Sequence, residues 1–214
     1  MAQRLGARVI HQEWLGYGPQ RQFAVEQARN DWIFALDADE RLTPELAAGL
    51  VEALAQPACA AYAVARRNRF MGCWLRHGEG YPDWCLRLFD RRRCRWSADS
   101  VHERLVVDGR VARLRGDLLH ESEQGLSSYL AKQNHYTDLQ ARLMYARGRR
   151  APVAGMMISP LVRFLKFYVL RRGFLDGVPG FVHIAVGCLT AFLKYAKLFE
   201  LQRQAREQRQ RTGE

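Results

Sequence analysis

The stretch Asp31-Trp32-Ile33-Phe34-Ala35-Leu36-Asp37-Ala38-Asp39-Glu40 decides the fold of this 214-residue chain. Its apolar run, residues 32–36, is typical of a strand that is buried on both faces. Two carboxylates, Asp37 and Asp39, follow at the end of that strand. Because ligands bind at this edge of open α/β sheets, the pattern predicts a binding site there.

The spacing of Asp37 and Asp39 favours a divalent cation. Two carboxylates two residues apart in a turn suit one Mg²⁺ or Mn²⁺, since both ions prefer hard oxygen ligands and take further oxygens from phosphates. A cation that bridges a diphosphate neutralises the charge that builds on a leaving group. The alternative interpretation is an acidic turn that caps the next helix.

Helix and strand signals alternate around this stretch. Residues 19–29 predict a short amphipathic helix. Thr43-Pro44-Glu45 predicts a helix that runs to about residue 54, with an N-cap, a proline at the first position and an acid in the first turn. A further strand is expected at residues 60–65. Strand, helix and strand with short connectors predict an α/β unit with a parallel pair of strands.

The first residues predict an interrupted start. Residues 2–5 resemble the last turn of a helix, Gly6 its C-cap, and residues 7–11 a strand. Arg4 and Arg8 precede no long apolar segment, so a signal peptide is not predicted. Because a domain seldom opens with half a helix, we expect this chain to lack elements that normally come before it.

The middle of the chain predicts short strands at residues 84–89, 104–107 and 110–114. Asp108-Gly109 between the last two is a strong hairpin signal. The last third predicts helices instead: one over residues 127–147, and a second that opens at Ser159-Pro160 and presents an apolar face with a basic flank.

Residues 177–193 carry no Asp, Glu, Lys or Arg, and a polar helix or tail begins at Lys194. Three glycines and one proline in this apolar segment make a membrane span less attractive. We therefore predict helices that lie in a membrane interface. The alternative is an ordinary helical subdomain that packs on the rest of the protein.

The charge of the chain predicts an anionic partner. It has 33 Lys and Arg residues against 22 Asp and Glu residues, a net charge of +11. The densest basic stretch borders the apolar helices, which favours an anionic membrane surface over nucleic acid. Zinc-finger spacing, an RNP-like aromatic strand and a heptad-backed basic region are all missing from the sequence. The five cysteines form no C-x-x-C pair, so the sequence predicts a reducing, cytoplasmic setting.

The motifs in combination resemble a known family. The stretch 31–40 looks like the metal-binding core of family 2 glycosyltransferases, and more narrowly of bacterial enzymes that build lipopolysaccharide core or related surface glycans. Gly16-Tyr17-Gly18-Pro19-Gln20-Arg21-Gln22 resembles the segment that precedes this core. Arg87-Leu88-Phe89 and Val101-His102-Glu103 match later motifs in order and spacing, and residues 174–177 and 194–197 also resemble that subgroup.

The resemblance implies an α/β fold of the GT-A type, a Rossmann-like mixed sheet flanked by helices. The catalytic domain would comprise residues 1–122, incomplete at the N-terminus, and residues 123–214 would form a helical, basic, membrane-associating region. The donor would be a nucleotide-sugar, linked to UDP, ADP or GDP. The acceptor would be a lipid-linked glycan at the cytoplasmic face of the bacterial inner membrane.

The resemblance also implies an inverting transfer, in which an acceptor hydroxyl attacks the anomeric carbon as the nucleoside diphosphate departs. Asp37 and Asp39 would hold the metal on the diphosphate, with Asp39 preferred as the direct ligand. A carboxylate must take the acceptor proton. Glu103 is preferred for that role and Asp83 comes second, while the structural alternative pairs Glu103 with Arg104 or Arg87.

Three further residues are candidates for the site. His120 is a candidate third metal ligand, since imidazole suits Mn²⁺ better than Mg²⁺. Arg21 and Arg87 are candidates for the diphosphate, because guanidinium pairs well with phosphate oxygens. The alternatives are a surface or helix-capping role for the histidine and solvated surface charges for the arginines.

Three other functions stay open at this point. A charge of +11 would also serve a nucleic-acid-binding protein. A glycoside hydrolase would use two carboxylates without a nucleotide or a metal. The strand and carboxylate-bearing loop that normally grip the nucleotide are not found in this sequence, which leaves a non-catalytic remnant of a glycosyltransferase as the third alternative.

Overall fold

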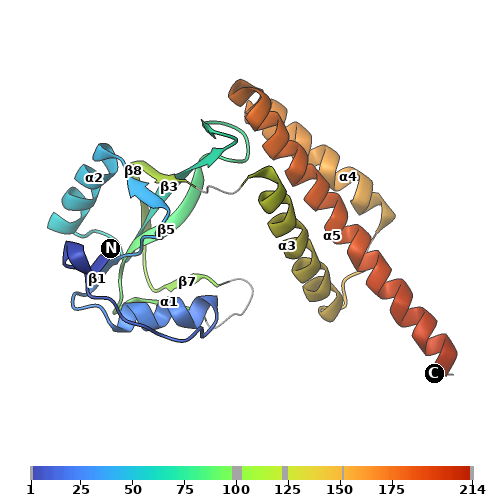
Figure 1. Ribbon diagram of the computed structural model, residues 1–214, viewed down its shortest axis with the longest axis horizontal. Helices are drawn as coiled ribbons and strands as arrows, with labels where there is room; N and C mark the ends of the chain where they lie inside the picture. Colours follow the sequence, from blue (N-terminus) through green and yellow to red (C-terminus); the bar gives the residue numbers. More distant parts are fainter. Residues whose placement is uncertain (1, 98–102, 122–124, 151, 213–214) are drawn as a thin grey trace. The chain divides into compact units, whose positions relative to one another are not determined.

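The computed structural model describes residues 2–97, 103–121, 125–150 and 152–212 and shows a mixed α/β protein (Figure 1). The strands are β1 (Trp32–Phe34), β2 (Glu40–Leu42), β3 (Ala61–Phe70), β4 (Cys73–Trp74), β5 (Asp83–Asp90), β6 (Cys94–Trp96), β7 (Leu105–Val107) and β8 (Val111–His120). The helices are α1 (Tyr17–Glu26), α2 (Pro44–Ala55), α3 (Leu126–Ala146), α4 (Val153–Phe164) and α5 (Gly177–Thr212).

The chain forms two compact units. The first contains residues 1–35, 56–63 and 86–113, and the second contains residues 36–55, 64–85 and 114–214. The predicted domain boundary at residue 122 falls in the segment 122–124, which lies outside the described residues. It stays a prediction.

The main sheet has the strand order β1-β5-β3-β8-β2, with β4 paired to β3. Strand β1 runs antiparallel to β5, with Trp32 opposite Asp90. Strand β3 also runs opposite to β5, because the Asp90 N–H bonds the carbonyl next to β3 at Ala60, whereas Arg66 bonds Asp83 at the other end. Strands β1 and β3 therefore point the same way, but β5 separates them. The predicted direct parallel pair is wrong in this respect.

Strand β1 is shorter and more exposed than its sequence predicted. It ends at Phe34, and all three of its residues are only half-buried, because β1 lies at the end of the sheet order. An edge strand has a neighbour strand on one side only, so β1 is covered less than a strand in the middle of the sheet would be. Its apolar residues still contribute to the core: Ile33 packs against a buried cluster of Val25, Ala60, Ala61, Phe89, Cys94 and Leu105.

Helix α1 depends on a glycine for its close approach to the chain around Ser97. A Cβ atom at Gly18 would collide with the Ser97 carbonyl oxygen. The Gln22 side chain on the same helix accepts a hydrogen bond from the Trp96 N–H at 3.0 Å. The glycine-containing segment that precedes β1 thus begins a helix that packs closely on β6.

Helix α2 begins as its sequence predicted. The Thr43 hydroxyl accepts a hydrogen bond from the Leu46 N–H at 3.3 Å, which is the contact of an N-cap residue. The same oxygen also accepts a bond from the Asp117 N–H at 3.1 Å, so the cap fixes α2 to β8. Pro44 is the first helical residue, and Glu45 is the acid in the first turn.

Two strand predictions in this part are wrong. Strand β7 pairs with β6 in a separate two-stranded sheet and does not form a hairpin with β8. The backbone explains why: the Asp108 N–H bonds Arg93, whereas the Arg110 carbonyl accepts bonds from the chain at Ala60. Gly109 has φ +130°, so the chain turns there and passes from one sheet to the other. Residues 7–11 form no strand or helix in the described structure.

The last third is helical, as predicted, with different bounds. Helix α4 begins at Val153 and contains Pro160 in its interior, so the prediction that a helix opens at Ser159-Pro160 is wrong. Pro152 precedes α4, and a π-helical segment, Leu165–Leu170, continues it. The apolar segment and the polar tail join in one long helix, α5, which lies along α4 (Figure 1).

Two helical segments, Val153–Leu170 and Gly173–Gln210, are long and apolar enough to cross a membrane by length and composition. They also contain the motif residues that resembled the bacterial subgroup. The Asp176 carboxylate accepts hydrogen bonds from the backbone N–H groups of Arg76 and His77, at 2.9 and 2.8 Å. The Lys197 ammonium bonds Asn134 on α3, so these motif residues have structural roles.

Candidate functional site

The two aspartates of the motif lie in a tight turn between β1 and β2. The Glu40 N–H bonds the Asp37 carbonyl at 3.1 Å, and the Asp37 N–H donates to the Glu40 carboxylate at 3.0 Å. Asp37 is half-buried, and the Asp39 side chain is 48% exposed. The turn therefore presents the Asp39 carboxylate to solvent while the buried Glu40 holds the backbone behind it.

Pairing of β2 with β8 places His120 beside this turn. Glu40 lies opposite His120 in the register, and the Glu121 N–H bonds the Asp39 carbonyl at 2.9 Å. The Nε2 atom of His120 lies 3.1 Å from a carboxylate oxygen of Asp39. Two of the predicted metal ligands, 81 residues apart in the sequence, are thus in contact.

The contact of the other ring nitrogen of His120, Nδ1, indicates where the ring carries its hydrogen. Nδ1 lies 2.7 Å from the side-chain oxygen of Asn68, and the Asn68 amide nitrogen donates to the Gly80 carbonyl at 3.2 Å. Because this second bond fixes which end of the amide faces the ring, Nδ1 carries a hydrogen and donates it. In neutral imidazole Nε2 then has a lone pair directed at the Asp39 carboxylate.

A lone pair and a carboxylate that face each other need a positive charge between them. Either a second proton on the imidazole or a bound cation meets that need. A neutral imidazole whose other nitrogen donates a hydrogen bond is also the usual metal-binding form of histidine. Asp39 and His120 therefore fit a divalent cation, although no group of three or more His, Cys, Asp or Glu side chains with metal-binding geometry occurs among the described residues.

A second network of polar side chains includes Arg66 on β3. Its guanidinium donates two hydrogen bonds to one Asp83 oxygen, at 2.9 and 2.7 Å, and lies 3.7 Å from the buried Glu40 carboxylate. Burial lowers the pKa of Arg66, but Cys85, Asp83 and Glu40 raise it above its ordinary value, so Arg66 remains a cation. Asp83, the second candidate base, is thus held by a permanent positive charge.

The remaining candidates lie in the first unit. Glu103 is half-buried and lies near Gly18 of α1, because a Cβ atom at that glycine would be 3.4 Å from the Glu103 Cβ. The Arg21 guanidinium stacks over the Trp96 ring at 4.9 Å. Arg87 on β5 is only 3% exposed. His102, the neighbour of Glu103 in its motif, lies outside the described residues.

Sequence reasoning missed Asn68, Arg66 and the role of Glu40. The signal for the first two was the change from the apolar residues 60–65 to Arg66-Arg67-Asn68 at the end of a buried strand. Polar residues at such an end frequently face a ligand site. Glu40 follows the motif directly, but its burial depends on β2, which has no clear sequence signal.

Comparison with known proteins gives the class and then the family. The sequence profile of glycosyl transferase family 2 matches residues 1–104. A lipopolysaccharide core biosynthesis glycosyltransferase, LpsC of Rhizobium meliloti, is 33% identical over 196 residues, which cover 90% of this chain and 73% of that protein. An uncharacterized glycosyltransferase of Rickettsia typhi is 28% identical over 218 residues, covering 96% and 75%, and one of Rickettsia prowazekii is 28% identical over 213 residues, covering 94% and 73%.

The protein is a glycosyltransferase. It belongs to glycosyltransferase family 2 and is related to lipopolysaccharide core biosynthesis enzymes. This family implies the GT-A fold and, in general, a nucleotide-sugar donor, in agreement with the mixed sheet described above.

Proposed function

We propose that this protein is an inverting, metal-dependent glycosyltransferase that moves a sugar from a nucleotide-sugar to a lipopolysaccharide core or a related lipid-linked glycan. One observation carries the metal-dependent part of the proposal. The Asp39 carboxylate and the His120 Nε2 atom converge at 3.1 Å, and the Asn68 contact at Nδ1 fixes the orientation of the ring. Oxygen and imidazole donors in this arrangement favour Mn²⁺ or Mg²⁺.

Asp39 and His120 are the residues that would hold the cation, and Asp37 is a further candidate ligand from the same turn. When bound, Mg²⁺ or Mn²⁺ neutralises the negative charge that develops on the departing nucleoside diphosphate. Asn68 and Gly80 position the imidazole, and Glu40 holds the turn through the Asp37 N–H. Arg21 and Arg87 are our candidates for contacts to the phosphates, because a guanidinium group forms charge-assisted, paired hydrogen bonds with phosphate oxygens.

The transfer step itself needs one base. A hydroxyl oxygen of the acceptor forms a bond to the anomeric carbon of the donor sugar. The bond from that carbon to the phosphate oxygen breaks, and the diphosphate leaves with its electron pair. The hydroxyl proton passes to a carboxylate, for which we propose Glu103, with Asp83 as the alternative. Glu103 is preferred because one oxygen of Asp83 already accepts two hydrogen bonds from Arg66.

The helices support a lipid-linked acceptor and a peripheral position at the cytoplasmic face of the bacterial inner membrane. In α4 and the segment after it, large apolar side chains are strongly exposed: Val153 67%, Met157 69%, Leu161 59% and Leu170 78%. Surfaces of this kind mark sites where a protein meets lipid or another protein. The relative from Rhizobium meliloti, by its name, acts in lipopolysaccharide core biosynthesis, which agrees with an acceptor at that membrane.

The experiment that tests this function measures transfer of labelled sugar from UDP-, ADP- and GDP-linked donors into a bacterial lipid extract, with Mn²⁺ or with EDTA. We expect transfer with one class of donor, its loss in EDTA, and a decrease of at least about 100-fold in Asp39→Ala. The matched control is Glu52→Gln, an exposed carboxylate on α2. Transfer that survives EDTA, or an Asp39→Ala variant with full activity, would refute the metal-dependent mechanism.

A further inference from the structure

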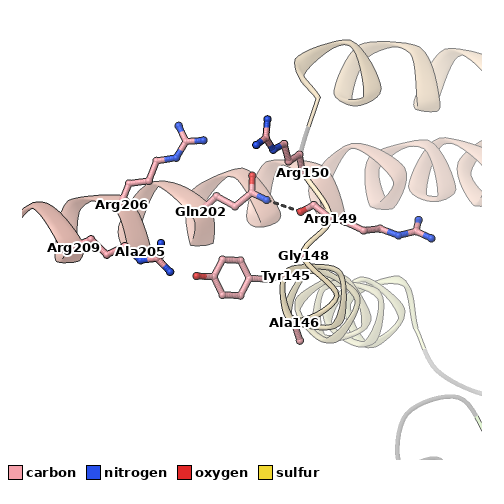
Figure 2. Close-up of a pocket in the computed structure, with 9 residues that line it drawn as sticks. All are labelled: Tyr145, Ala146, Gly148, Arg149, Arg150, Gln202, Ala205, Arg206 and Arg209. Atoms are coloured by element: carbon pink, nitrogen blue, oxygen red, sulfur yellow. Dashed lines mark hydrogen bonds between the residues drawn. The ribbon is translucent and has the colours of Figure 1, made fainter. Parts of the chain in front are cut away.

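A pocket of about 450 Å³ lies between the end of α3 and the second half of α5 (Figure 2). Helix α3 ends at Ala146, and Gly148 takes φ +66°, a left-handed conformation that reverses the chain at low cost. The Arg149 N–H returns to the Met144 carbonyl at 3.0 Å. The turn after α3 is therefore well defined, and it brings Arg149 and Arg150 to the side of α5.

Helix α5 meets this turn with one face. Gln202, Ala205, Arg206 and Arg209 line the pocket and follow the spacing i, i+3, i+4 and i+7, so they share a side of the helix. The Gln202 amide donates a hydrogen bond of 2.6 Å to the Arg149 carbonyl and ties the turn to the helix. Figure 2 shows the Tyr145 ring and this bond between the two elements.

The pocket concentrates positive charge. Four of its nine lining residues are arginines, Arg149, Arg150, Arg206 and Arg209, and none of these nine described residues is acidic. The acidic residue nearest in sequence to Arg206 is Glu207, and its carboxylate bonds Arg203 at 2.8 Å on another side of α5. Arginine side chains that line one pocket carry like charges that repel one another, and a bound anion relieves that repulsion.

We propose that this arginine pocket binds the phosphate group of an anionic membrane lipid. Guanidinium groups match phosphate oxygens with paired hydrogen bonds, and Tyr145, whose hydroxyl is a neutral donor, also lines the pocket. In Figure 2 the Arg149 side chain extends away from Arg206, so Arg150 and Arg206 are the principal phosphate contacts in our assignment.

The lipid, and not a free phosphate, is the occupant that the surroundings favour. Three residues after Arg150, α4 begins with exposed Val153, and Met157 and Leu161 continue the apolar surface along that helix. Basic side chains at the border of an exposed apolar helix are the arrangement of interfacial helices, where the acyl chains meet the apolar side and the phosphates meet the cations. The site rests on the proposed function only in placing the protein at a membrane.

The test compares two single substitutions with the same change of charge. Arg206→Gln removes a pocket arginine, and Arg203→Gln removes an arginine on the same helix that does not line the pocket. Flotation at 0.15 M salt measures binding to phosphatidylcholine vesicles with and without phosphatidic acid. We expect binding that depends on phosphatidic acid, weakened about tenfold or more by Arg206→Gln and less than about threefold by Arg203→Gln.

Two further arms make the result decisive. Arg206→Lys keeps the charge but loses paired hydrogen bonding, and we expect an intermediate affinity. Inorganic pyrophosphate, followed by calorimetry without vesicles, tests the soluble source. Equal losses in Arg206→Gln and Arg203→Gln, or no loss in either, would overturn the pocket. Tight pyrophosphate binding that needs Arg206, without vesicle binding, would overturn the lipid. Because no arm requires sugar transfer, failure here is distinct from failure of the proposed function.

Discussion

His120 is oriented from both sides of its ring, by Asn68 at Nδ1 and by Asp39 at Nε2. This is the geometry of a histidine with a fixed proton, which suits metal binding. The motif predicted that Asp37 and Asp39 lie together in one turn, since residues two apart in the sequence stay close in space. It did not predict the contact of Asp39 with His120, because the pairing of β2 with β8 creates that contact.

The catalytic base can also be tested at the level of single residues. We expect Glu103→Gln to reduce transfer by at least about 100-fold, because the amide cannot accept the acceptor proton. Binding of the donor, measured by calorimetry with the nucleoside diphosphate and Mn²⁺, should persist. Asp83→Asn is the companion variant, and we expect a smaller loss, since Asp83 is held by Arg66. If Asp83→Asn is inactive and Glu103→Gln is active, the two assignments exchange places.

Asp90 gives a prediction for the effect of pH on stability. Hydrogen bonds from Arg92 lower the pKa of this carboxylate below its ordinary value, against the opposing effect of burial. A lowered pKa in the folded state stabilises the protein above the ordinary aspartate pKa, and this stabilisation is lost as the pH falls through the folded value.

Asp90→Asn should therefore lower Tm by a few degrees at pH 7, and the difference from the parent protein should shrink below about pH 4. Thermal unfolding followed by circular dichroism between pH 7 and pH 2.5 measures this, with Glu52→Gln as the exposed control. A difference in Tm that is constant across this range would contradict the proposed origin of the stabilisation.

At the scale of elements, β8 and α2 approach each other at Gly116. This residue has φ +85°, and a Cβ atom there would collide with the backbone of Leu46. The sequence predicted the helix and a strand over residues 110–114, which ends before Gly116, and it gave no sign of the contact between them. Local patterns report on one element at a time, whereas the space between two elements depends on the whole sheet.

Gly116→Ala should therefore destabilise the protein by about 2 kcal/mol or more, from backbone strain and from displacement of α2. Gly125→Ala is the matched control, since Gly125 has φ −59° and open space where its Cβ would lie. Thermal or urea unfolding measures both variants. If Gly116→Ala unfolds at the same midpoint as the parent, the described packing of α2 on β8 is contradicted.

The strand predictions show that a local sequence pattern can predict a turn but not which strands pair with each other. Asp108-Gly109 is a turn, as predicted, but the strands on either side of it belong to different sheets. The pairing of β7 with β6 and of β8 with β3 depends on residues distant in the sequence, which a dipeptide cannot report. Pro160 is a second example, since it stands inside α4 and not at its start.

For the whole molecule, the net charge of +11 and the exposed apolar side chains of the helices both favour an anionic membrane surface as partner. Composition predicted an anionic partner, and the apolar pattern of the last third predicted the helices. Which side of α4 is exposed depends on its packing against α5, so the sequence alone did not identify the exposed residues.

Leu161→Glu tests the exposed side of α4. Leu161 is 59% exposed, so the change should leave Tm nearly unchanged while it weakens binding to anionic vesicles about fivefold or more. Val51→Glu, at a still more exposed position on α2, is the control and should bind as the parent does. A large decrease in Tm in Leu161→Glu would show that this side of α4 is packed against protein instead of lipid.

In the proposed mechanism, Asp39 and His120 together hold a divalent cation on the diphosphate of a nucleotide. Electron paramagnetic resonance of Mn²⁺ measures this directly, with the parent protein, Asp39→Asn, His120→Ala and Glu52→Gln, each with and without UDP, ADP and GDP. We predict that one nucleotide tightens Mn²⁺ binding in the parent and in Glu52→Gln, and that both site variants lose at least about tenfold in affinity. Equal Mn²⁺ affinity in all four proteins would refute metal binding by Asp39 and His120.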